Sequence, residues 1–345
     1  MNTLRQDLEI MARHNFVGLD ALRGVAALVV AVGHLGHVLE VRLEIPNTAL
    51  AVDFFFMLSG FVLAHAYAEK LNAGGGFAKY VEARTIRLYP MILIGTLLGA
   101  SALMVLGQEP AYIMRLAVQG SLLIPEIQPS EIDPSFLPLD PPAWSLFFEM
   151  AASVLYGWGL WRRATGLTLL ASTAFIIAAI VTTRTFDAGW SYHLWWVGFA
   201  RVSFGFAAGI WLYKNRHKWT PPSVPLPLVT AVLLAVLLSP FTGWLYQLTC
   251  VVALFPLLIL STAACADEYV RLSKWSGEIS YPLYIIHWPV YRWTSLLPVK
   301  GLVAGLLGLV TAVGLSATLL VAYDKPVRKW LAGYFRARRE RFGAP

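Results

Sequence analysis

Residues 18–37 read GLDALRGVAALVVAVGHLGH, a long apolar stretch in which the ionisable side chains Arg23 and His34 lie eleven residues apart. An α-helix turns about 100° per residue, so positions eleven residues apart share one face and are separated by about 16 Å along the axis. Ionisable groups within a membrane-spanning helix usually face the protein interior or a water-filled cavity. The stretch therefore predicts a membrane span with a basic group near one surface and a titratable imidazole at depth.

The composition extends this prediction to the whole chain. Of its 345 residues, 57% are hydrophobic and 14% are charged, and the mean hydropathy is +0.61. A soluble domain of this length carries about a quarter charged residues. The net charge of +7 comes from basic residues scattered between apolar segments, which favours topology signals over a nucleic-acid-binding surface. We therefore predict an all-α, polytopic integral membrane protein whose partner is the lipid bilayer and not nucleic acid.

About ten apolar segments are long enough to cross some 30 Å of hydrocarbon. They are residues 17–39, 48–67, 87–107, 143–161, 165–183, 192–213, 225–240, 243–265, 279–297 and 301–322. With the N-terminus inside, twenty of the 27 basic residues fall in inner segments and four in outer ones, which predicts that both termini are cytoplasmic. Residues 111–124 are too short and too charged for a span, and we expect an interfacial or re-entrant helix there. Pro256 is expected to kink its span.

Arg84 and Arg87, in YVEARTIRLYP, begin the third predicted span and are neighbours on a helix. Guanidinium groups bind phosphate oxygens bidentately, so the pair is a candidate clamp for an anionic reactant on the cytoplasmic side. An ordinary topology anchor is the alternative. For Arg23 taken alone, the favoured alternative is a side chain that extends to the inner interface beside Asp20. For His34 taken alone, it is a hydrogen-bonded packing residue.

Besides Asp20, two carboxylates fall within predicted spans. Glu149, in WSLFFEM, needs a cationic partner or a water-filled cavity, and a structural ion pair is the alternative interpretation. Asp53, in VDFFFMLSGF, is predicted to orient His34 or His37 by accepting a ring N–H.

The late stretch SYPLYIIHWPVYRW places Tyr284 and His287 on one helical face. The aromatic residues of this stretch also fit an interfacial belt, whereas His287 is flanked by apolar residues in mid-span. Together with Trp144 and Ser145 of the WSLFFEM motif, these two residues are candidates for contact with the substrate.

Taken in order, these motifs resemble the membrane-bound acyltransferase-3 family. The resemblance rests on GLDALRG with Arg23 and, after ten intervening residues, His34, then on VDFFFMLSGF, the Arg-x-x-Arg pair, WSLFFE, ISYPLYIIHWPV and the closing YDKPVRKWL. It covers nearly the whole chain. The one departure is mild, because Asp324 stands where the family often has glutamate.

The resemblance implies a membrane O-acyltransferase, of the class that transfers groups other than aminoacyl groups. Such an enzyme moves an acyl group, commonly acetyl, from cytoplasmic acyl-CoA to a hydroxyl acceptor, often a carbohydrate beyond a bacterial inner membrane. Carried over to this chain, His34 would be catalytic and Glu149 would support the site. Arg84 and Arg87 would contact the coenzyme A phosphates, and Arg23 would help to hold the donor.

The chemistry of the residues agrees with this expectation. A hydroxyl needs a base as it attacks a thioester, and an imidazole suits that task at neutral pH. We expect direct transfer with His34 as general base, and an acyl-histidine intermediate is the alternative. The rival class of protein is a proton-coupled transporter or exporter, which buried histidines and acids also suit, although the two halves of the chain show no convincing self-similarity.

We expect residues 1–345 to form a single acyltransferase-3 membrane domain, with a short cytoplasmic N-terminal segment, a basic tail at about 324–345 and no fused soluble domain. Cys250 and Cys265, fifteen residues apart on one predicted helix, cannot form a disulfide with each other. The resemblance implies acyl-CoA, commonly acetyl-CoA, as the donor substrate. The sequence contains no metal-ligand cluster, so no metal is expected.

Overall fold

The computed structural model describes residues 16–39, 41–74, 76–128, 130, 132–162, 165–219, 224–264 and 269–342. All of its named elements are helical, which confirms the predicted all-α fold. Within these ranges, one isolated bridge between Ser135 and Ser191 is the only strand-like pairing. Cys265 lies outside the described ranges, as do Arg5, Arg13 and Arg163, three of the twenty basic residues counted above in the inner segments.

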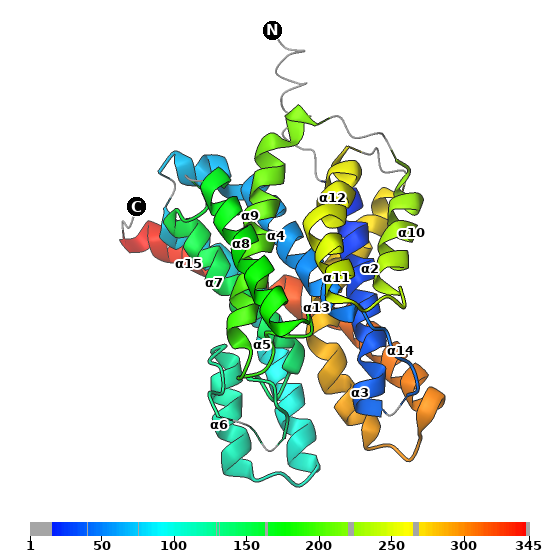
Figure 1. The fold of residues 1–345 in the computed structure, drawn as a ribbon. Coiled ribbons are helices and arrows are strands. Elements are labelled where there is room, and N and C mark those ends of the chain that lie inside the picture. Colours follow the sequence, from blue (N-terminus) through cyan, green and yellow to red (C-terminus); the bar gives the residue numbers. More distant parts are fainter. Residues whose placement is uncertain are drawn as a thin grey trace.

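Each predicted span coincides with a helical segment. In chain order the elements are α2 (Val17–Gly33), α3 (Leu35–Leu39), α4 (Thr48–Asn72), α5 (Phe77–Val105), α6 (Pro110–Ser121), η1 (Pro141–Ala143), α7 (Trp144–Trp158), α8 (Thr165–Thr183), α9 (Trp195–Asn215), η2 (Arg216–Lys218), α10 (Leu226–Leu237), α11 (Trp244–Thr249), η3 (Cys250–Leu254), α12 (Phe255–Ala263), α13 (Val270–Ser295), α14 (Gly301–Leu319), η4 (Leu320–Asp324) and α15 (Lys325–Phe342). Figure 1 shows these helices gathered into one bundle, with α2, α4 and α13 near its centre.

Six helical segments among the described residues are long and apolar enough to cross a membrane. They are Val17–Leu39, Thr48–Asn72, Phe77–Val105, Gly166–Thr183, Trp244–Ala263 and Gly301–Arg341. The larger count of ten spans is not confirmed and stays a prediction, as does the orientation of the termini. Helices α7 and α10 have only 15 and 12 residues, whereas α9 and α13 are longer but contain charged residues that lower their hydropathy, such as the buried Arg201 and Arg292.

The segment 111–124 forms the short helix α6. Glu109 caps it by accepting a hydrogen bond from the backbone N–H of Tyr112, and Pro110 occupies its first turn, where a missing N–H does no harm. Its apolar side packs on α5, so that the two helices project together from one end of the bundle (Figure 1). Its 12 residues are too few to span a bilayer.

Close packing between α2 and α13 joins an early helix of the chain to a late one. A Cβ atom added to Gly277 would lie 2.4 Å from the Cβ of Asp20, and one added to Gly24 would lie 1.7 Å from a serine hydroxyl of α13. Toward the other end, the Tyr291 hydroxyl donates a hydrogen bond of 2.9 Å to the Ala31 carbonyl. Small residues permit this close approach. In a membrane the hydrophobic effect does not drive helices together, so close van der Waals packing contributes to their association instead.

Helices α4 and α9 pack in the same way. A Cβ atom on Gly60 would lie 2.5 Å from the Phe206 carbonyl oxygen, and one on Gly209 would lie 2.1 Å from the Met57 carbonyl oxygen. Backbone therefore meets backbone along this interface, which fixes the register between the two helices.

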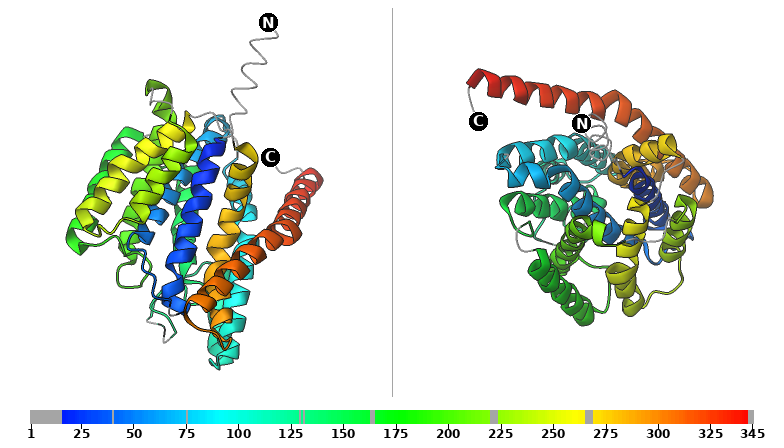
Figure 2. Two further views of the ribbon diagram at one scale, coloured as in Figure 1. Left: turned by 90° about the vertical axis from the view of Figure 1, so that its right-hand side faces the viewer. Right: turned by 90° about the horizontal axis from the view of Figure 1, so that it is seen from above.

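Two π-helical turns interrupt long helices. The first, η3, ends directly before α12, the helix that contains Pro256. The kink predicted at Pro256 stays a prediction. Proline has no N–H and its ring crowds the carbonyl four residues earlier, so the regular ladder cannot continue through it. The second turn, η4, joins α14 to α15. Figure 2 shows α15 running from there along the edge of the bundle.

Candidate active site

His34 lies at the junction between α2 and α3, where it occupies the C-cap position with φ −82° and ψ −6°. Its Nδ1 atom is 2.8 Å from Nε2 of His287, which belongs to α13. The two rings are nearly parallel, at 5° between their planes. His287 is fully buried, whereas His34 is partly exposed and also contacts the ring of Trp288. The structure thus joins two histidines that are 253 positions apart.

The hydrogen-bond partners decide which nitrogen atoms carry protons. His287 Nδ1 is 2.9 Å from the Leu283 carbonyl oxygen. A carbonyl only accepts, so His287 Nδ1 donates, and in the neutral ring its Nε2 then accepts. His34 Nδ1 must therefore be the donor of the bond to His287. The remaining nitrogen, His34 Nε2, carries a lone pair and makes no hydrogen bond with any residue that the structure describes.

Asp53 does not contact either histidine through a hydrogen bond. Its two oxygens accept from Arg201 Nε at 3.0 Å and from an Arg201 terminal nitrogen at 2.8 Å, and both side chains are 1% exposed. Arg201 also donates to the carbonyls of Ala188 and Ala49, and its guanidinium lies over the Trp144 ring at 5.2 Å. A buried carboxylate requires such a charge-assisted partner. The predicted ring N–H of His34 or His37 is thus replaced at Asp53 by the Arg201 guanidinium.

Glu149 also has an arginine partner. One of its oxygens accepts from Arg84 at 2.7 Å and from the Ser59 hydroxyl at 3.0 Å, which links α7 to α5 and α4. Arg84 is buried, with 7% of its surface exposed, and Glu149 is its ion-pair partner. Arg87, one turn further along α5, is exposed instead. The two arginines predicted to act as a pair therefore face different surroundings.

Arg87 lines a cavity of about 410 Å³ at the end of the bundle where α2 begins. Arg23, Lys274 and Arg328 also line it, so α2, α5, α13 and α15 each contribute one cation, and the carboxylates of Asp20, Glu278 and Asp324 line it as well. Arg23 pairs with Asp20 at 3.2 Å. Arg87 has no ion-pair partner within the described ranges. The cavity can therefore accept an anion whose charge compensates that guanidinium.

The four remaining candidates are the predicted substrate contacts Trp144, Ser145, Tyr284 and His287. The hydroxyls of Ser145 and Tyr284 lie 2.7 Å apart, and each is within hydrogen-bond distance of the Pro142 carbonyl oxygen. Each hydroxyl has one proton, so one of them donates to the other and the second donates to the carbonyl. The Tyr284 ring is 6.2 Å from that of His287, one turn later on α13. Trp144 is occupied by its contact with Arg201. These side chains are buried, so the structure brings Ser145 and Tyr284 next to the histidine pair rather than into the charged cavity.

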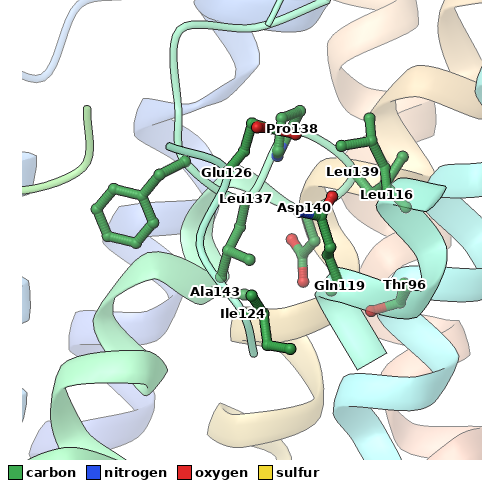
Figure 3. A pocket seen from close by; sticks show the side chains of 12 residues that line it. Thr96, Leu116, Gln119, Ile124, Glu126, Leu137, Pro138, Leu139, Asp140 and Ala143 are labelled. Carbon is green, nitrogen blue, oxygen red and sulfur yellow. The ribbon is translucent and has the colours of Figure 1, made fainter. Parts of the chain in front are cut away.

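A second hollow lies between α5, α6 and the loop that leads to α7. Figure 3 shows the polar side chains of Thr96, Gln119 and Asp140 among the apolar ones around it. Its volume of about 10 Å³ is enough for about one water molecule and excludes a sugar ring. Burial raises the pKa of the Asp140 carboxyl well above its usual range, and nearby Arg292 opposes that rise only in part.

Sequence reasoning missed the roles of Arg201 and Arg328. Arg201 could have been recognised, because an arginine in the middle of a predicted span requires a buried acidic partner. Arg328 follows Asp324 by four residues, a spacing that pairs side chains on a helix, but only the tertiary structure directs it to the cavity.

Comparison with known proteins assigns the chain to a family. The profile of the acyltransferase-3 family, described as an acyltransferase domain, matches residues 16–323. The chain is also 35% identical over 184 residues to protein 2 in the picA locus of Rhizobium radiobacter, an alignment that covers 48% of this chain and 94% of that protein. No solved structure matches the chain. The chain therefore belongs to the acyltransferase-3 family, and it is a multi-pass membrane acyltransferase.

Proposed function

We propose that this protein is an O-acyltransferase that moves an acyl group, acetyl in the simplest case, from cytoplasmic acyl-CoA to a hydroxyl of a carbohydrate or other envelope acceptor. Family membership supplies the reaction class. The observation that supports His34 as the base is the hydrogen-bonded chain from His34 through His287 to the Leu283 carbonyl. That chain leaves the lone pair of His34 Nε2 available to accept a proton.

The donor belongs in the charged cavity. Coenzyme A carries its phosphates at one end and the thioester at the other, and guanidinium groups such as those of Arg23 and Arg87 bind phosphate oxygens bidentately. Arg23 and His34 lie eleven residues apart along one helical segment, which corresponds to about 16 Å. A donor bound by its phosphates at the cavity would therefore extend its thioester toward His34.

The proton on the acceptor then has a defined route. As the acceptor oxygen attacks the thioester carbonyl, a C–O bond forms and His34 Nε2 removes the hydroxyl proton. Collapse of the tetrahedral intermediate breaks the C–S bond, and the proton passes from His34 to the departing thiolate, which leaves as the thiol of coenzyme A. His287 Nε2 accepts from His34 Nδ1–H throughout, so it holds the ring and stabilises the transient imidazolium.

The orientation follows from the charges. Twenty of the 27 basic residues fall in segments on one side of the proposed spans, which supports the proposal that both termini are cytoplasmic. The membrane we propose is the bacterial inner membrane. The mouth of the donor cavity, at Arg23 near the start of α2, then opens on the side that contains acyl-CoA.

The experiment uses the purified full-length protein with radiolabelled acetyl-CoA and an envelope glycan or glycolipid fraction, and it follows both label transfer and thiol release. His34→Ala is expected to keep the wild-type melting temperature and to lose about 10²- to 10⁴-fold in rate. His217→Ala, at an exposed histidine in η2, is the matched control and should transfer at the wild-type rate.

Two outcomes would contradict the proposal. Transfer by His34→Ala near the wild-type rate would remove the base assignment. Failure of the wild-type protein either to bind or to consume acetyl-CoA would favour the proton-coupled carrier instead. Mass spectrometry of envelope glycans and lipids, with and without the gene, would then identify the acceptor from the acetylated species that disappear.

A further inference from the structure

Three guanidinium groups from three different helices meet at the cytoplasmic cavity: Arg23 of α2, Arg87 of α5 and Arg328 of α15. We propose that Arg328 is a phosphate-binding residue of the donor site, so that the helix following the last predicted span forms part of the acyl-CoA site. This inference rests on the proposed function, and it extends the donor site to a residue outside every predicted span.

Arg328 is held in place and still has donors to offer. One terminal nitrogen lies 2.6 Å from an oxygen of Asp324, whose side chain is 1% exposed, whereas the Arg328 side chain is 22% exposed. A guanidinium has five N–H donors in a fixed plane, so one bond to Asp324 orients the group and leaves other donors for a ligand. Asp324 is the last residue of η4, the π-helical turn that directly precedes α15.

The docking of α15 fixes this arrangement. Near its beginning, Lys325 pairs with Glu278 of α13 at 2.8 Å. Near its other end, Arg339 pairs with Glu82 of α5. Figure 2 shows the helix lying along the edge of the bundle. Arg328 therefore reaches the cavity from a helix that is attached at both ends.

The charges in the cavity favour an anionic ligand. Asp20, Glu278 and Asp324 also line it, and Asp20 and Asp324 pair with Arg23 and Arg328. Arg87 has no ion-pair partner among the residues described, and the charges of Arg23 and Arg328 lie close enough to repel its own. An anion that binds beside Arg87 would offset this repulsion. A group with several phosphates, such as the nucleotide end of coenzyme A, can contact all three guanidinium groups at once through bidentate bonds.

The test measures the affinity of the full-length purified protein for coenzyme A by calorimetry. Arg328→Gln is expected to weaken binding by about 10- to 100-fold, the effect of losing one charge-assisted contact. Arg336→Gln, an exposed arginine on the same helix that does not line the cavity, is the matched control and should bind as the wild type does. Dephospho-coenzyme A, which lacks the 3′-phosphate, shows which phosphate group Arg328 binds. If Arg328→Gln weakens the binding of both ligands equally, Arg328 contacts the pyrophosphate. If it weakens the binding of coenzyme A alone, Arg328 contacts the 3′-phosphate.

The melting temperature of each variant separates a lost contact from a displaced helix. If Arg328→Gln is unstable, Arg328→Lys keeps the charge without the planar fork and is still expected to bind coenzyme A more weakly at wild-type stability. Wild-type affinity in a folded Arg328→Gln or Arg328→Lys protein would overturn this inference alone. Absence of coenzyme A binding by the wild-type protein would overturn the proposed donor and the inference together.

Discussion

His34 Nδ1 and His287 Nε2 lie 2.8 Å apart, and the bond between them leaves His34 Nε2 as the basic atom of the pair. His287 thus occupies the position in which a carboxylate orients the histidine of many hydrolases. A neutral imidazole can fill that position because its own Nδ1 is held by the Leu283 carbonyl at 2.9 Å.

The first prediction concerns His287 as a positioning residue. His287→Leu removes the acceptor for His34 Nδ1–H, so kcat should fall by about tenfold or more while KM for acyl-CoA stays near the wild-type value. His287→Gln retains a side-chain oxygen that can accept that bond, and it should recover part of the loss. Equal kcat in the leucine and glutamine variants would indicate that the hydrogen bond does not orient His34.

The second prediction separates Arg84 from Arg87. Arg87→Gln should raise KM for acyl-CoA with little change in melting temperature, because Arg87 lines the cavity and has no ion-pair partner among the described residues. Arg84→Gln should instead lower the melting temperature, because it leaves the part-buried Glu149 carboxylate without its cation. Steady-state kinetics and thermal unfolding of the two variants would test whether the two arginines have these different roles. If both variants raised KM and neither lowered the melting temperature, the prediction would be wrong.

The third prediction concerns Asp53 and Arg201. Asp53→Ala should destabilise the protein by about 3–5 kcal/mol, the usual cost of leaving a buried charge without its partner. Replacing both residues by apolar ones, as in Asp53→Leu with Arg201→Met, should recover much of that loss. Thermal unfolding of the two single variants and the double variant measures the coupling. A stable Asp53→Ala protein without transferase activity would instead support the catalytic role expected from the sequence.

The fourth prediction concerns pH. Burial raises the pKa of Asp140 in the folded protein, so its contribution to stability is full at low pH and is lost as the pH rises through that folded-state pKa. Asp140→Asn removes this dependence. Its melting temperature should therefore exceed that of the wild type by a margin that grows from acidic toward alkaline pH.

Asp187→Asn, at an exposed aspartate, serves as the control for the general effect of removing a carboxylate. The assay is the melting temperature of the three proteins in detergent over a series of buffers. A constant difference between Asp140→Asn and the wild type across the whole pH range would show that the Asp140 carboxyl is not affected by its burial.

Much of the fold follows from local sequence. The apolar segments from residue 17 to residue 322 all coincide with helices, because length and composition determine whether a segment can satisfy its backbone hydrogen bonds within itself. The number of spans is harder to predict. Buried arginines such as Arg201 and Arg292 lower the hydropathy of α9 and α13, although tertiary partners compensate those charges.

The candidate site could be predicted only in part. The motifs located the residue types and placed Arg23 and His34 at related positions of one segment, since helical periodicity acts within a single element. Periodicity within one helix could not predict the partners of buried groups, because those partners lie on other helices. Asp53 was expected to serve a histidine and pairs with Arg201, and Arg84 pairs with Glu149 rather than lining the cavity with Arg87.

The sequence by itself determined the membrane class, the helices and the family, because these depend on apolar length and on motifs of a few residues. Only the tertiary structure decided that His34 meets His287 and that Arg328 reaches the donor cavity. The physical reason is that a buried polar group takes whichever partner the packed helices bring within hydrogen-bond distance. That distance depends on close contacts between helices, such as Gly277 against Asp20, which join segments more than 250 positions apart.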